Sequence, residues 1–314
     1  MGSTGSTGAT GHTGSTGATG PAGAGLDVTG TNYSDYLYWN SGTTAWEVGS
    51  TSVHIGANAG LTGQGDHSVA IGPSSGLTGQ ASQSVAIGYQ AGQNGQEIQS
   101  VAIGSGAGQT GQRNNSVAIG YDAGNAEQGE GSVALGSQAA ETGQGEYSVA
   151  LGSGAAEYGQ GNQSVAIGSI AGQNGQGTKS VAIGSQAGQT AQGANSIAIG
   201  LDAGKKEQGG ITGSAIAIGD NAGSDDQSPY SIALGYYAGQ NSMGENSIAI
   251  GNKAGFNNHA DNTIVLNAGP DKLDGDTSGA LYISPIREMT GVVGGATGVL
   301  RYDSDTNEIR YDTN

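Results

Sequence analysis

Apolar and polar positions recur every sixteen residues between Ser52 and Asn267, with the consensus S-V-A-I-G-x-x-A-G-x-x-G-Q-G-x-x. Fourteen copies are present, and a three-residue insertion near Gly210–Gly213 shifts the frame once. A long series of short repeats predicts a solenoid. The period of two within SVAIG predicts a β-strand, and the glycine density excludes a helix. The sequence therefore predicts an all-β chain whose main body is a parallel β-solenoid of fourteen coils.

The faces of this strand follow from its alternation. The second and fourth positions, such as Val85 and Ile87, are aliphatic in every coil and share one face. We expect this face to fill the interior of the coil. The third position, such as Ala86, is Ala in twelve of the fourteen coils. A solvated face would vary and carry charge, so we expect the alanine face to pack against another copy of the chain.

Two further positions are nearly invariant. The fifth is Gly in thirteen coils, which predicts a corner where the backbone needs a positive φ. The thirteenth is Gln in eleven successive coils, including Gln96 and Gln112. Stacked amides form hydrogen-bonded ladders, which is the interpretation we favour, and a row of amides that binds a ligand is the alternative.

The first 25 residues have a period of three. Only glycine fits at the axis of a collagen triple helix, so this period predicts a collagen-like stalk and three chains. Low-complexity disorder is the alternative, although it would not keep so strict a spacing. The glycines concerned are Gly2, Gly5, Gly8, Gly11, Gly14, Gly17, Gly20 and Gly23.

Residues 26–51 hold both tryptophans of the chain, Trp39 and Trp46, on either side of a turn near Asn40–Gly42. This pattern predicts a hairpin. We interpret it as a neck between the stalk and the solenoid, with an aromatic sugar-binding surface as the alternative.

The repeat decays after Asn267, and we place the solenoid at 52–271 and a C-terminal cap at 272–314. ALYISPI predicts a strand, and the segments that flank Asp303–Asn307 predict a β-hairpin. We expect this segment to close the edge of the last coil. Its aspartates lack the spacing of an EF-hand loop, so no metal site is predicted.

Charge and composition narrow the function. The net charge is −17, and no Lys or Arg precedes Arg113, which disfavours binding to nucleic acid or to an anionic membrane. Neither a signal peptide nor a long apolar membrane span is predicted. The insertion, with Lys205 and Lys206, is a candidate contact surface or a benign bulge. Cysteine is absent, and no nucleophile–base pair or phosphate loop appears, so we predict neither an enzyme nor a cofactor.

The recurring SVAIG and SIAIG segments, each followed by Ala-Gly, resemble the heads of trimeric autotransporter adhesins. This resemblance covers about residues 52–267 and implies a left-handed β-roll that is trimeric around one axis. The N-terminal triplets, the aromatic segment YLYWNSGTTAWEVG and the tail LYISPIR resemble collagen-like fibre proteins of large DNA viruses and of phage tails.

Together these patterns predict a structural fibre protein that forms a rigid homotrimer on a virion or another extracellular surface, for attachment or spacing. Two alternatives stay open. Trimers could join head to tail into a filament, since the two ends carry different modules. The fibre could also be an adhesin that binds a host glycan or protein. Trp39, Trp46, Lys205 and Lys206 are the candidate contact residues.

Overall fold

The computed structural model describes residues 3, 28–49, 51–210, 212–286, 299–303, 306 and 308–312. This part of the chain contains β-strands and turns but no helix. It divides into two compact units, Met1–Ser50 and Thr51–Asn314. The predicted collagen-like triplets, except for Ser3, lie outside the described residues, so the stalk stays a prediction.

In the first unit, the antiparallel strands β1 (Leu37–Asn40) and β2 (Ala45–Val48) form the hairpin that the sequence predicts. The side chain of Asn40 organises the turn, because its Oδ1 accepts from the backbone N–H of Gly42 at 2.9 Å. Thr44 closes the turn with a φ of 53°.

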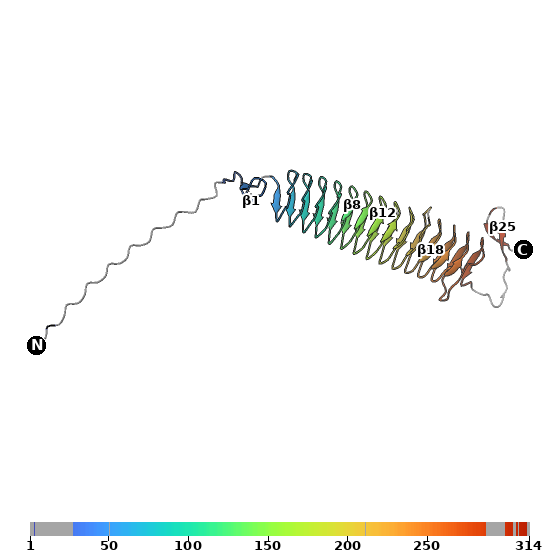
Figure 1. Cartoon of the computed structure of the whole chain (residues 1–314). Helices are drawn as coiled ribbons and strands as arrows, with labels where there is room; N and C mark the ends of the chain where they lie inside the picture. The colour runs from blue at the N-terminus through green and yellow to red at the C-terminus, as the bar shows by residue number, and fades with distance from the viewer. Residues whose placement is uncertain are drawn as a thin grey trace. The chain divides into compact units, whose positions relative to one another are not determined.

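In the second unit, one parallel sheet contains one strand from each coil and a final strand from the C-terminal segment (Figure 1). The strands of this first sheet are β3 (Val53–Ile55), β4 (Val69–Ile71), β5 (Val85–Ile87), β6 (Val101–Ile103), β7 (Val117–Ile119), β9 (Val133–Leu135), β11 (Val149–Leu151), β13 (Val165–Ile167), β15 (Val181–Ile183), β16 (Ile197–Ile199), β17 (Ile216–Ile218), β19 (Ile232–Leu234), β21 (Ile248–Gly251), β23 (Ile264–Asn267) and β24 (Leu281–Ser284).

A second row of short parallel strands runs along another side of the coils, around the Gln of the repeat. Isolated bridges, such as Thr62↔Thr78 and Asn174↔Thr190, extend this row between the strands. Its strands are β8 (Ala126–Gln128), β10 (Thr142–Gln144), β12 (Tyr158–Gln160), β14 (Asn174–Gln176), β18 (Asp225–Gln227), β20 (Asn241–Met243) and β22 (Asn257–His259).

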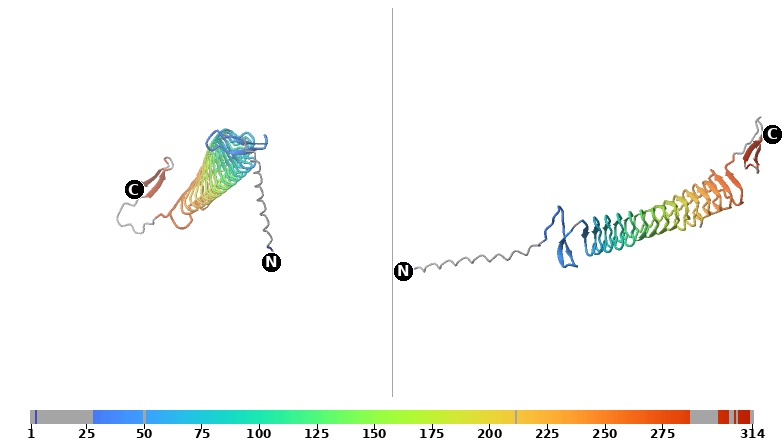
Figure 2. Two further views of the ribbon diagram at one scale, coloured as in Figure 1. Left: turned by 90° about the vertical axis from the view of Figure 1, so that its left-hand side faces the viewer. Right: turned by 90° about the horizontal axis from the view of Figure 1, so that it is seen from above.

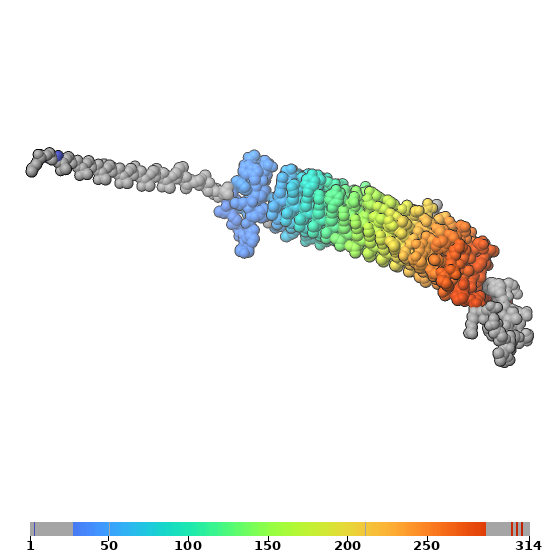
Figure 3. Space-filling model, turned by 90° about the horizontal axis from the view of Figure 1, so that it is seen from below, coloured from blue at the N-terminus to red at the C-terminus, as the bar shows by residue number. Residues whose placement is uncertain are grey.

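Equivalent repeat positions stack on one another. Val85 pairs with Val101, and Ala86 with Ala102, sixteen residues on. The strand register is unchanged across the insertion, where Ala198 pairs with Ala217. At about 4.8 Å per coil, this stacking makes the solenoid roughly 65 Å long. Figure 2 shows the coils from two further sides, and Figure 3 shows them in close contact along the stack.

The prediction for the two faces of the first strand is wrong, because the faces are exchanged. Ala86 is fully buried inside its coil, whereas Val85 and Ile87 point outward and are only half-buried. The same pattern holds along the sheet, where each central alanine is buried. The alternation was identified correctly, but the alanine row is the interior of the chain itself.

The physical reason is the width of the coil. A Cβ added to Gly92 would lie 3.2 Å from the Cβ of Ala86 and 2.6 Å from Oε1 of Gln96. The wall that faces the alanine row is therefore too close for a Val or Ile side chain to fit between. The predicted corner at the fifth position of the repeat is confirmed. Gly88 has a φ of +131°, and a Cβ added to it would lie 2.5 Å from the carbonyl oxygen of Gly104.

The C-terminal segment contains the predicted strands. β24 extends the first sheet in parallel with β23, so the solenoid sheet continues to Ser284, beyond the predicted boundary at 271. Strands β25 (Val299–Asp303) and β26 (Glu308–Asp312) pair antiparallel, which confirms the hairpin.

Candidate interaction surfaces

The outward side chains of the first sheet form a continuous aliphatic ribbon. We define this ribbon as the second and fourth positions of the fourteen coils, from Val53 and Ile55 to Ile264 and Leu266. No polar residue occupies any of these positions. Leu151 is 39% exposed and Ile183 is 36% exposed in the single chain. An uninterrupted exposed apolar surface of this kind marks a site of contact with another molecule.

Inside the coils, the glutamines of the repeat form a buried column. Gln96 Nε2 donates to Oε1 of Gln112 at 3.1 Å and to the carbonyl oxygen of Val85 at 2.8 Å. Gln80 in turn donates to Gln96 at 3.1 Å. Because these amides are buried and bonded to one another, they are not exposed to a ligand. The alternative of a ligand-binding row is therefore wrong.

From Gln80 onward the glutamine column is divided into three runs, which the sequence does not reveal. Within each run every glutamine except the last donates to the next glutamine, and the first Oε1 of each run accepts no hydrogen bond from the described residues. The runs begin at Gln80, Gln128 and Gln192, and the last one ends where Gln227 Nε2 lies 4.0 Å from Sδ of Met243.

His259 occupies the column position that follows Met243. It is 2% exposed, and neither ring nitrogen makes a hydrogen bond of ordinary geometry with the described residues. Burial lowers the pKa of this imidazole, while the backbone of Thr263 and the carboxylate of Asp274 oppose the effect in part. The fold therefore favours the neutral ring.

The extra residues follow Gln208, which agrees with the predicted frame shift near Gly210–Gly213. Lys206 pairs in register with Thr190, and Gln208 continues the glutamine column, so both lysines precede the extra residues. Both candidate lysines are engaged on their own chain. Lys205 Nζ lies 3.2 Å from Oδ1 of Asp202, and Lys206 Nζ lies 3.0 Å from Oδ1 of Asp225.

On one face of the N-terminal hairpin, a polar network is centred on Glu47. Its carboxylate accepts hydrogen bonds from the Tyr38 hydroxyl at 2.7 Å, the Asn40 amide at 3.0 Å and the Thr43 hydroxyl at 2.6 Å. The hydrogen bonds from Asn40, Thr43 and Tyr38 lower the pKa of Glu47 to about 2, and the bond to Glu47 raises the pKa of Tyr38 to about 12.

The opposite face of the hairpin is apolar. Trp39 pairs with Trp46, and Leu37 pairs with Val48. The two indole rings meet edge to face, with centroids 5.8 Å apart. Trp39 is 52% exposed and Trp46 is 45% exposed. The two tryptophans lie in the first compact unit and the two lysines in the second.

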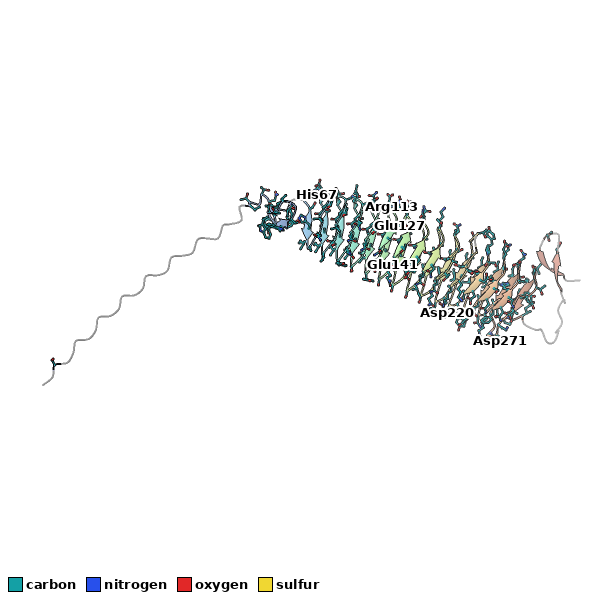
Figure 4. All side chains as sticks on the ribbon, viewed as in Figure 1. His67, Arg113, Glu127, Glu141, Asp220 and Asp271 are labelled. Atoms are coloured by element: carbon teal, nitrogen blue, oxygen red, sulfur yellow. The ribbon has the colours of Figure 1, made fainter. Side chains whose placement is uncertain are left out.

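Figure 4 labels ionisable side chains along the solenoid, among them Glu127, which is exposed, and Glu141, which is half-buried. Burial and the neighbouring Glu157 raise the pKa of Glu141. A groove of about 560 Å³ is lined by four glycines, three side-chain amides and the charged residues Arg113, Glu127 and Glu146, of which Arg113 and Glu146 form an ion pair at 3.6 Å. This lining offers no nucleophile next to a base.

No group of three or more His, Cys, Asp or Glu side chains among the described residues could hold a metal ion. The same residues include no helix with the length and apolarity of a membrane span.

A family model for the YadA head domain repeat matches residues 128–155, 176–203, 213–238 and 244–254. All four segments lie in the solenoid and cover less than half of the chain. Neither the comparison with curated proteins nor that with solved structures finds a match. The chain therefore contains repeats similar to the head of a trimeric autotransporter adhesin, as its SVAIG segments indicate. The resemblance of its terminal segments to viral fibre proteins stays a prediction.

Proposed function

We propose that this chain is a structural fibre protein that works as a homotrimer on an extracellular or virion surface, for attachment or spacing. The observation that carries the proposal is the aliphatic ribbon. It runs along the whole solenoid without a polar residue, and in the single chain it faces solvent. Other copies of the chain would cover this ribbon by packing their own aliphatic ribbons against it.

The proposed number of chains, three, rests on a separate feature. A collagen-like helix requires three chains, and the eight glycines at every third position from Gly2 to Gly23 supply its repeat. The similarity to YadA head repeats supports the same stoichiometry, since the heads of that family are trimeric adhesins. The net charge of −17 keeps such a particle soluble and makes an anionic partner unfavourable.

The test is the solution mass of the full chain, measured by light scattering after size exclusion. We expect three times the chain mass of 30.6 kDa. The double variant Leu151→Lys/Ile183→Lys places two charges in the ribbon and is expected to weaken the assembly. The matched control, Thr142→Lys/Thr190→Lys, places the same charges on exposed residues of the second row of strands. A monomeric wild-type chain, or equal effects of the two double variants, would contradict the proposal.

A second candidate function is adhesion, in which the fibre binds a host glycan or protein. The similarity to the YadA head domain repeat favours it. Binding of the wild-type trimer to an array of glycans and to host-cell surfaces would test it. We also propose that the chain is not an enzyme, and hydrolysis of a polysaccharide panel by the purified chain would contradict this.

A further inference from the structure

The N-terminal hairpin presents two unlike faces. On the polar face, the carboxylate of Glu47 already receives three hydrogen bonds from side chains of the same hairpin. This face needs no partner. On the apolar face, Leu37, Trp39 and Trp46 remain 41%, 52% and 45% exposed.

An isolated two-stranded hairpin is marginally stable in water. A tryptophan buries about 150–250 Å² when it is fully covered, so most of the stabilisation available to this hairpin lies on its uncovered face. The hairpin is therefore incomplete without something that covers Trp39 and Trp46.

We propose that the tryptophan faces of three hairpins, one from each chain of the fibre, pack on one another and form a trimeric clamp between the stalk and the solenoid. The inference rests on the proposed homotrimer and names a contact that the aliphatic ribbon does not provide. Its surface is defined by Leu37, Trp39, Trp46 and Val48.

The connection to the triplets favours a second copy of this chain as the occupant. Only thirteen residues separate Gly23, the last glycine of the triplets, from Leu37. A segment of this length spans at most about 50 Å, so chains joined in a triple helix hold their hairpins close together. Tethers this short give effective concentrations on the order of millimolar.

The chemistry of the face disfavours a glycan. A sugar site combines aromatic rings with a few polar groups that bind the hydroxyls. The cross-strand neighbours of the tryptophan pair are Leu37 and Val48, and the polar side chains of the hairpin lie on the other face. A face whose polar atoms are the two indole N–H groups suits another apolar face better than it suits a sugar.

Tryptophan fluorescence reports on this contact alone, because Trp39 and Trp46 are the two tryptophans of the chain. In the full-length trimer, we expect acrylamide to quench them several-fold less efficiently than it quenches a free indole. In the variant Trp39→Lys, the remaining Trp46 should become as accessible as free indole. Trp39→Phe, which keeps an apolar ring, and Ala45→Ser, on the polar face, should leave the protection in place.

The outcomes separate this inference from the proposed function. A particle with the trimer mass whose tryptophans are quenched like free indole would refute the clamp and leave the trimer standing. Protection that appears only when an oligosaccharide is added would also refute it, in favour of sugar binding. A monomeric chain would overturn both proposals.

Discussion

The glutamine column offers the sharpest test of what stabilises the coils. Gln96 Nε2 donates to the carbonyl oxygen of Val85 at 2.8 Å and to Gln112 Oε1 at 3.1 Å, and its Oε1 accepts from Gln80 at 3.1 Å. The side chain is 1% exposed, so water cannot replace these bonds. The variant Gln96→Leu has a similar volume and removes all of them.

The cost can be worked out from the partners that remain. Gln112 Oε1 loses its only amide donor among the described residues, and Gln80 Nε2 keeps one bond, to the carbonyl oxygen of Val69 at 2.9 Å. A buried polar group left without a partner costs about 1–3 kcal/mol, which applies to Gln112 Oε1, and the lost bond from Gln80 Nε2 costs about 0.5–1.5 kcal/mol. The added apolar contacts of Leu offset part of this, and we expect a net loss of about 1–3 kcal/mol.

The assay is urea denaturation of the full chain at one fixed concentration, followed by far-ultraviolet circular dichroism. Gln96→Leu should lower the midpoint with little change in slope. The reciprocal variant Met243→Gln restores an amide next to Gln227, whose Nε2 now faces a sulfur at 4.0 Å, and should raise the midpoint. If Gln96→Leu were as stable as wild type, the amide ladder would not contribute to stability and the reasoning would fail.

Three further predictions follow from single positions. Gly88→Ala should destabilise its coil by at least about 3 kcal/mol, because a Cβ there would meet the carbonyl oxygen of Gly104 at 2.5 Å; Gly95→Ala, where an added Cβ meets nothing within 4 Å, should cost only the left-handed penalty of about 1–2 kcal/mol in the same denaturation assay. Glu47 has a folded pKa of about 2, below its ordinary 4.5, so its contribution to the stability of the hairpin should be complete above pH 4.5 and be lost as the pH falls towards 2. Tryptophan emission would report this loss, and the variant Glu47→Gln should abolish the pH dependence. His259 has a folded pKa below the ordinary 6.5, so below that pH the unfolded chain binds more protons than the folded chain. The denaturation midpoint should therefore fall as the pH drops below 6.5. A flat pH profile that matches that of His259→Met would contradict the role of burial.

The sequence was sufficient to predict the repeat, the SVAIG strand of each coil, the corner glycines and both hairpins, because each is a local property of the chain. The second row of strands around the glutamines was not predicted. The face of the SVAIG strand that points into the coil could not be derived from the alternation alone, because Val, Ile and Ala are all apolar. A signal did exist on the opposite wall. The eighth and ninth positions, such as Ala91 and Gly92, are also small, and two facing walls of small residues leave room only for alanine between them.

The remaining misses concern distances rather than patterns. The three runs of the glutamine column depend on whether successive amides lie within hydrogen-bond distance. The sequence cannot show this distance, because the same residue stands at each repeat position. The ion pairs of Lys205 and Lys206 depend in the same way on side-chain geometry. Beyond the predicted boundary at 271, β24 follows β23 by seventeen residues instead of sixteen, which breaks the repeat but not the sheet.

The exchanged faces change how the fold is stabilised. Inside a coil the apolar side chains are almost all alanines, whose burial contributes little, so backbone hydrogen bonds between coils and the glutamine column hold the single chain together. The larger side chains, Val, Ile and Leu, lie on the outer face, where the single chain covers them only in part. In the proposed homotrimer the rest of their apolar area would be buried between chains, and we expect this burial to add to the stability that stacking of the coils provides.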